Sequence, residues 1–151
     1  MPDNTAFFDT SAIVPLCVAQ QSSQKAKQVY RGFTRQVVAW TASIEASGAI
    51  YRAVRLGGLS ESNAKRALGR LTQLEKRWTE IIASDRVRHT AITMLSNYDL
   101  RAADAVQLAS ALVWCKDKPR NRSFVCFDQK LANAARAVGF TQLGIVIKTV
   151  A

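Results

Sequence analysis

Four acidic side chains of this 151-residue chain lie in predominantly apolar stretches, where an unpaired carboxylate is costly. They are Asp9 in FFDTSA, Glu45 in SIEASGAI, Asp104 in AADAVQLA and Asp128 in CFDQKL. The remaining acids lie in polar stretches, at expected helix caps or on expected helix surfaces, and need no special explanation. The four apolar stretches therefore raise the question of what stabilises their charges.

A shared cation is one answer for these four carboxylates. Two like charges about 5 Å apart repel by roughly 3 kcal/mol at an effective dielectric of about 20, so four converging acids are unstable alone. Oxygen donors without histidine or cysteine suit a hard ion, Mg²⁺ or Mn²⁺. The four acids thus predict a metal site, provided that the fold brings them together.

Each acid also has an ordinary structural explanation. Asp9 and Asp128 follow expected strands and could cap the helices that come next. Glu45 could pair with a basic residue or face solvent, and Asp104 could favour the dipole at a helix N-terminus. Asp99 is the expected N-cap of that helix, which would place Asp104 one turn further in. Capping therefore explains Asp104 least well.

The sequence lacks the residues that other common catalytic mechanisms require. His89 is the one histidine, which excludes cleavage by a histidine pair and a zinc site with the usual ligands. Ser11 has no nearby histidine base and no Gly-x-Ser-x-Gly elbow, so a serine hydrolase is not expected. The chain also has no glycine-rich phosphate loop.

Expected strands alternate with expected helices along the chain. The strands are TAFFD (5–9), QVVAW (36–40), EII (80–82), SFVCFD (123–128) and LGIVIKTV (143–150). The helices are 11–18, 25–33, 41–58 with Thr41 as N-cap, 59–78, 84–98, 100–112 and 129–140 closed by Gly139. This alternation predicts an α/β fold with a parallel sheet covered on both faces, in one domain over residues 1–151. Sites in such sheets lie at the carboxyl ends of strands, where Asp9 and Asp128 fall.

The composition narrows the class of protein and its partners. The formal charge of +10 favours a polyanionic partner such as nucleic acid, although a basic surface could equally serve an acidic protein. The three cysteines form no CxxC pair, which indicates a reducing cytoplasm. We expect no membrane association, because the N-terminus has an acid where a signal peptide is basic and no apolar run approaches a membrane span.

The four acidic stretches together resemble the motifs of a known family. FFDTSAIVPLCV, SIEASGAIYRAVRLGGLS, LRAADAVQLASAL and FVCFDQKLANAARAVGF are similar to the four acidic motifs of PIN-domain ribonucleases, and most of all to those of VapC-type toxins. The motifs follow the family's order and spacing over nearly the whole chain. The resemblance implies a single PIN domain over 1–151, a three-layer α/β/α sandwich with a central parallel sheet of four to five strands.

The resemblance also implies an activity and its residues. It implies a Mg²⁺- or Mn²⁺-dependent endoribonuclease that hydrolyses RNA phosphodiester bonds with a metal-activated water. Asp9, Glu45, Asp104 and Asp128 would be the catalytic residues and metal ligands, and Ser11 would supply a supporting hydroxyl. One departure concerns the position two residues before the fourth acid, where many relatives have Ser or Thr.

Cys126 occupies that position in this chain. A thiol is a weak hydrogen-bonding group, so the departure leaves open how firmly Asp128 is held.

Basic residues near the acidic motifs are candidates for RNA contact. These are Arg52, Arg55, Arg101 and Lys130.

The expected partners are an RNA substrate, with tRNA or rRNA as candidates, a cognate antitoxin protein and a second copy of the chain in a homodimer. The apolar stripe of residues 64–78 could pack on that second copy or on the core. Two alternative functions are a housekeeping PIN-domain RNA-processing nuclease without an antitoxin and a catalytically silent nucleic-acid-binding module.

Overall fold

One parallel sheet forms the centre of the protein in the computed structural model, which describes residues 4–145. In spatial order its strands are β3 (Thr79–Ile81), β2 (Arg35–Ala39), β1 (Thr5–Phe8), β4 (Ser123–Val125) and β5 (Thr141–Leu143). All the neighbouring strands pair in parallel. This number and direction of strands confirm the predicted sheet.

Alternate residues of the strands enter two separate cores, as the period of two in a strand requires. Ala6 and Phe8 of β1 lie in one core, and Phe7 lies in the other. On the second face the rings of Phe7 and Phe124 stack with their centroids 5.3 Å apart. Because both faces are apolar, both must be covered by helices.

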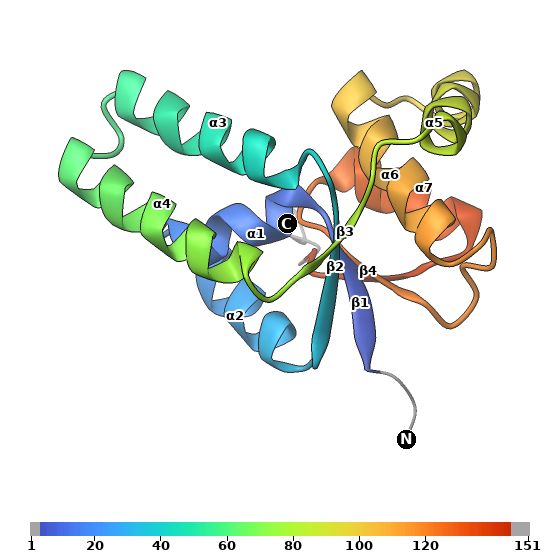
Figure 1. Ribbon diagram of the computed structural model, residues 1–151, viewed down its shortest axis with the longest axis horizontal. Coiled ribbons are helices and arrows are strands. Elements are labelled where there is room, and N and C mark those ends of the chain that lie inside the picture. The colour runs from blue at the N-terminus through green and yellow to red at the C-terminus, as the bar shows by residue number, and fades with distance from the viewer. Residues whose placement is uncertain (1–3, 146–151) are drawn as a thin grey trace, which may run out of the picture.

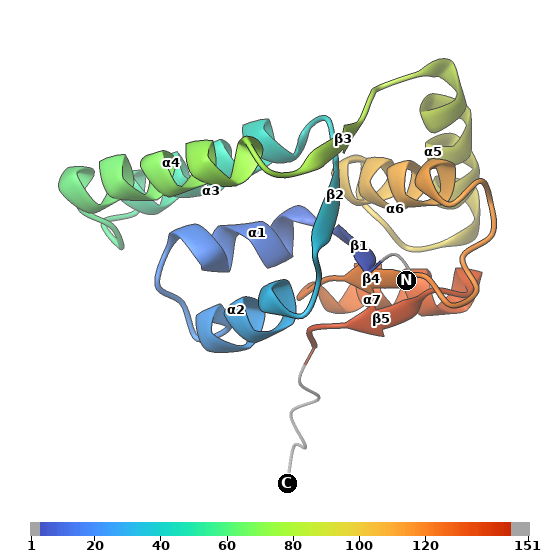
Figure 2. The ribbon, with the colours of Figure 1, turned by 60° about the horizontal axis from the view of Figure 1, so that its bottom comes forward.

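Helices cover both faces of the sheet (Figures 1 and 2). On one face lie α1 (Thr10–Cys17), α2 (Ser23–Arg31), α3 (Ala42–Arg55) and α4 (Glu61–Glu75). On the other lie α5 (Asp85–Asn97), α6 (Ala102–Trp114) and α7 (Gln129–Val138). The predicted three-layer α/β/α sandwich is therefore confirmed. None of the helices within residues 4–145 has both the length and the apolar character that crossing a membrane requires.

The apolar stripe of α4 packs on the core. Ala64, Ala67 and Leu71 are buried in the same core as α1 and α3. Of the two positions that the sequence allowed for this stripe, the core is the one that the fold uses.

The order of the strands creates a crevice at the carboxyl ends of β1 and β4. These neighbours lead into helices on opposite faces of the sheet, β1 into α1 and β4 into α7. Such a reversal of strand order leaves a gap above the sheet edge, which is the usual place for a site in an open α/β sheet. Asp9 directly follows β1, and Asp128 lies three residues after the end of β4.

Thr41 is the N-cap residue of α3 as predicted, although its side chain makes no capping hydrogen bond. Two local predictions were wrong in detail. The N-cap of α6 is Arg101 and not Asp99, so Asp104 lies in the first turn of that helix. The last strand is Thr141–Leu143, so the predicted strand 143–150 began too late, and residues 146–150 lie outside the described part of the chain. Gly139, by contrast, closes α7 as predicted, with a left-handed φ of 117°.

Candidate active site at the carboxyl edge of the sheet

Asp9 is the most buried of the four acids, with an exposed fraction of 3%. It is the N-cap of α1, and its Oδ2 accepts hydrogen bonds from the backbone N–H of Ser11 (3.1 Å) and the Ser11 hydroxyl (2.5 Å). The pKa of Asp9 is raised to about 6, mainly by burial and to a smaller extent by the nearby charges of Glu45 and Asp104, while the hydrogen bonds from Ser11 act in the opposite direction. The capping interpretation is therefore correct for Asp9, yet the carboxylate also lies beside two other acids.

Ser11 connects Asp9 to the segment that follows β4. Its hydroxyl oxygen accepts a hydrogen bond from the backbone N–H of Phe127 (2.8 Å) while it donates to Asp9. The N–H of Asp9 in turn donates to the carbonyl oxygen of Val125 (3.0 Å). These contacts hold the end of β1 and the β4–α7 segment in one position.

Glu45 lies in the first turn of α3 and is half-buried. Its Oε2 accepts hydrogen bonds from the Thr41 hydroxyl (2.8 Å) and from Nε2 of Gln107 (2.7 Å). Burial raises the pKa of Glu45, and the charge of Asp104 adds to that effect. Within residues 4–145 Glu45 forms no ion pair, so the alternative pairing with a basic residue is not observed.

Asp104 lies in the first turn of α6, and 18% of its side chain is exposed. Burial and the charge of Asp128 raise its pKa, whereas Arg101 lowers it. The Arg101 Nε lies 3.6 Å from Asp104 Oδ2, but the arginine side chain is 86% exposed, so this pair is weak. The helix dipole favours Asp104 more than the sequence indicated, because the helix begins at Ala102.

Asp128 is the N-cap of α7, and its Oδ1 accepts from the backbone N–H of Leu131 (2.9 Å). The Sγ of Cys126 accepts from the Asp128 N–H at 3.3 Å and lies 3.3 Å from the Asp128 carbonyl oxygen. The thiol thus occupies the place where a hydroxyl was expected and contacts the backbone of Asp128. Capping is the observed local role of Asp128, as it is for Asp9.

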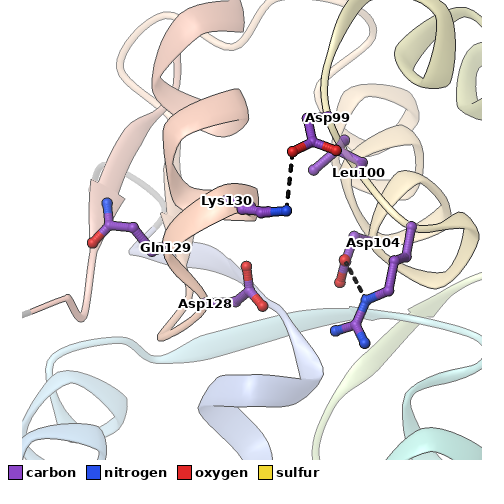
Figure 3. A pocket seen from close by; sticks show the side chains of 7 residues that line it. Asp99, Leu100, Asp104, Asp128, Gln129 and Lys130 are labelled. Carbon is purple, nitrogen blue, oxygen red and sulfur yellow. Dashed lines mark ion pairs between the residues drawn. The ribbon is translucent and has the colours of Figure 1, made fainter.

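A pocket of about 470 Å³ lies between Asp104 and Asp128. Figure 3 shows these two carboxylates on opposite sides of the pocket, one from α6 and the other from the start of α7. Lys130 points toward Asp99, with which it forms an ion pair at 3.0 Å. The lining of the pocket therefore combines acidic side chains with the basic side chains of Arg101 and Lys130.

The donor set of this site fits a divalent cation. It consists of carboxylate oxygens whose charges act on one another, from Asp9 to Glu45 and Asp104 and from Asp104 to Asp128. In the part of the chain that the structure describes, no three acidic, histidine or cysteine side chains converge closely enough to hold an ion as they stand. Carboxylate oxygens are the donors that a hard cation prefers. Of the four acids, Asp104 and Asp128 line the pocket, whereas Asp9 and Glu45 lie outside its lining.

The four basic candidates for RNA contact occupy two different places. Arg101 and Lys130 line the pocket. Arg52 and Arg55 are exposed in the last turns of α3 and do not line it. Of the four candidates, Arg101 and Lys130 are therefore the two that lie beside Asp104 and Asp128.

Gln107 is a site neighbour that the sequence prediction missed. It is completely buried in α6, and its Nε2 also donates to the hydroxyl of Thr10 at 3.2 Å. Its signal in the sequence is one polar amide within AADAVQLASAL, one helical turn after Asp104. That pattern marks Gln107 as unusual but does not reveal its contact with Glu45.

Comparison with known proteins identifies the fold. No protein-family model matches the sequence, and no curated protein matches it either. Among solved structures, a chain of a toxin–antitoxin complex from Klebsiella pneumoniae is similar, with a TM-score of 0.54 and 18% identity over 84% of this chain and 90% of that chain. The protein PAE2754 from Pyrobaculum aerophilum is similar, with a TM-score of 0.56 and 17% identity over 96% of this chain and 90% of that one. The chain thus shares its fold, over most of its length, with a component of a toxin–antitoxin complex.

Proposed function

We propose that this protein is a Mg²⁺- or Mn²⁺-dependent endoribonuclease of the PIN-domain, VapC-type class, acting as the toxin of a toxin–antitoxin pair. The observation that supports the proposal is the set of four carboxylates whose charges act on one another, of which Asp104 and Asp128 line one pocket. They come from four different elements, and three of them have raised pKa values because burial and neighbouring acids disfavour their charges. A pairing role would require basic partners, and Arg101 is the single basic residue that forms an ion pair with any of the four within residues 4–145.

The proposed roles follow from the positions of the side chains. Asp9, Glu45, Asp104 and Asp128 would hold the cation, and Ser11 would orient Asp9 through its 2.5 Å hydrogen bond. A cation held there would supply an activated water and would neutralise charge on the scissile phosphate. Arg101 and Lys130, at the rim of the pocket, would contact the phosphates of an RNA strand.

An antitoxin and a second copy of the chain are the proposed protein partners. The fold similarity to a chain of a toxin–antitoxin complex supports the first of these. Large apolar side chains are exposed on and beside α3 and α5, which is surface available to a protein partner: Trp40, Ile44, Tyr51, Ile92 and Leu95. Sedimentation of the purified chain measures whether it forms a dimer.

Cleavage of RNA by the purified protein tests the enzymatic proposal. We expect structured RNA to be cut in the presence of Mn²⁺, not in EDTA, and not by Asp104→Asn, with sequencing of new 5′ ends identifying the target. If the wild type cuts no RNA with either ion, and Asp104→Asn is as harmful as the wild type when expressed in cells, the proposal is wrong.

Expression without a partner separates the toxin from the housekeeping nuclease. A toxin arrests growth when expressed alone, and the arrest disappears when a co-expressed antitoxin binds it. An active nuclease that is harmless at high level would favour the housekeeping function. An inactive protein that still binds RNA would favour a silent binding module.

A further inference from the structure

Gln107 is a buried polar side chain in an otherwise apolar part of α6. Its exposed fraction is 0%, and its buried neighbours in sequence are Ala105, Leu108 and Ala109. It lies three residues after Asp104, so the two side chains share one face of the helix. A buried amide in such surroundings is costly unless its hydrogen bonds are made.

The contacts of Gln107 join three elements that carry acids of the site. Its Nε2 donates to Oε2 of Glu45 on α3 at 2.7 Å and to the hydroxyl of Thr10, next to Asp9, at 3.2 Å. The Thr41 hydroxyl donates to the same Glu45 oxygen at 2.8 Å. Both of these bonds to Glu45 end on Oε2, and a hydrogen bond with the Thr10 side chain also lowers the pKa of Glu45.

The remaining atom of the amide argues against a purely structural role. Within residues 4–145 the Oε1 of Gln107 is buried and has no hydrogen-bond partner. An unpaired buried acceptor is destabilising, so stability alone would favour an apolar side chain here. The unpaired Oε1 of Gln107 destabilises the fold, and the hydrogen bond from its Nε2 to Glu45 is the interaction that an apolar side chain could not make.

The neutrality of the Gln107 amide also suits a position beside a carboxylate that would bind a cation. A lysine or arginine at position 107 would neutralise Glu45 and compete with a cation, whereas an apolar residue would remove a donor from a half-buried carboxylate. A neutral donor fixes the carboxylate and leaves its negative charge available to an ion. Groups that orient ligating side chains in this way commonly change metal affinity by about 10- to 100-fold when they are removed.

We infer that Gln107 is a positioning residue that holds the Glu45 carboxylate in the orientation in which it binds the ion. This inference rests on the proposed function, since it assumes that Glu45 is a ligand. Gln107 itself is not a catalytic residue, because it acts through Glu45.

The first test compares the Mn²⁺ affinity of Q107M with that of the wild type by calorimetry. Methionine keeps the length of the side chain and removes the donor, so we expect the dissociation constant to rise by about 10- to 100-fold. The matched control is Ser110→Ala on the same helix, which removes a buried hydroxyl that donates to the Val106 carbonyl oxygen at 2.7 Å and contacts no acid of the site. The control should bind Mn²⁺ like the wild type.

A double-mutant cycle tests whether the effect passes through Glu45. In an E45Q background, Q107M should produce no further loss of Mn²⁺ affinity, because the side chain that Gln107 positions no longer carries the ligating charge. An equal loss in both backgrounds would overturn the inference. A wild type that binds no Mn²⁺ contradicts the proposed function, whereas a wild type that binds it with the same affinity as Q107M contradicts the inference alone.

A measurement on the wild type covers the case in which Q107M does not fold. In ¹⁵N-resolved NMR spectra, the side-chain amide signals of Gln107 should shift during a Mg²⁺ titration with the same midpoint as the backbone signal of Glu45. Signals of Gln107 that do not change while those of Glu45 do would show that the amide is not coupled to the ion.

Discussion

Asp9 is a buried acid whose protonation is coupled to the folding of the chain. Its carboxyl is buried, and its pKa of about 6 lies above the value of 3.8 that applies to an exposed aspartate. The folded protein therefore holds this proton over a pH range in which the unfolded chain has lost it. Stability from this group is present at low pH and is lost as the pH rises toward and through about 6.

This linkage predicts a pH-dependent difference between the wild type and Asp9→Asn. In EDTA, the free energy of unfolding of the wild type should fall relative to that of Asp9→Asn by about 3 kcal/mol between about pH 4 and pH 7, since a shift of one pKa unit corresponds to about 1.4 kcal/mol. Urea unfolding at several pH values measures the difference. Mg²⁺ should stabilise the wild type at neutral pH and not the variant, because a ligand of the native state raises stability. If the free energies of unfolding of the two proteins changed with pH in parallel, the raised pKa of Asp9 would be contradicted.

Asp104 can be tested for a role beyond the helix dipole. Asp104→Glu keeps a negative charge in the first turn of α6, so a residue that serves only the dipole should tolerate the change in both stability and activity. A ligand should not, because the longer side chain moves the carboxylate. We expect the melting temperature to stay near that of the wild type while Mn²⁺ affinity falls at least tenfold, measured by thermal unfolding and calorimetry. If Asp104→Glu bound Mn²⁺ as tightly as the wild type, Asp104 would not be a ligand and its role would be limited to the helix dipole.

At the scale of elements, the site depends on how the β4–α7 segment is held. Gly144 follows β5 with a φ of 115°, and a Cβ atom there would lie 2.8 Å from the carbonyl oxygen of Cys126. That contact is with the backbone, so the segment carrying Asp128 would have to move. The position of Asp128 thus depends on a glycine sixteen residues later in the sequence.

A pair of glycine variants tests this dependence. Gly144→Ala should lower the free energy of unfolding by about 1–3 kcal/mol, because it combines a left-handed φ with a backbone clash. Gly48→Ala is the matched control: it lies within α3 with no atom within 4 Å of the added carbon, and should raise that free energy by about 0.5–1 kcal/mol. Guanidinium unfolding of both proteins provides the comparison. A neutral Gly144→Ala would show that the segment adapts without cost.

At the scale of the whole molecule, the charge of +10 governs the expected binding of RNA. The basic residues are spread over the chain, but Lys130 lines the pocket, whereas Arg52 lies outside it. For a short RNA oligonucleotide, the dependence of affinity on salt counts the phosphates that the protein contacts.

Salt titrations should separate these two residues in an Asp104→Asn background, where we expect no RNA cleavage. Lys130→Gln should reduce the slope of log affinity against log salt by about one, and Arg52→Gln should leave it unchanged. Fluorescence anisotropy with a labelled oligonucleotide measures both. Equal slopes for all three proteins would mean that Lys130 contacts no phosphate.

Much of the architecture follows from local sequence pattern. The strands TAFFD and QVVAW and the end of α7 at Gly139 were predicted, and capping by Asp9 and Asp128 was one of the two explanations that the sequence offered. Each of these features depends on residues within one or two turns of itself. Alternation of strands and helices also specified the three-layer sandwich, since a parallel sheet must be covered on both faces. The start of α6 was misplaced, because Asp99 is a good cap by type but pairs with Lys130 instead.

The contacts between distant segments were decided only by the tertiary structure. The hydrogen bond from Gln107 to Glu45 joins residues 62 apart, and that from Phe127 to Ser11 joins residues 116 apart. Such contacts depend on the order of the strands and on how each helix packs against the sheet, which no local pattern contains. The sequence by itself determined which residues carry charge at the ends of its elements. The packing of α3 against α1 and of α6 against β2 determined which of those charges are neighbours and which neutral side chain contacts Glu45.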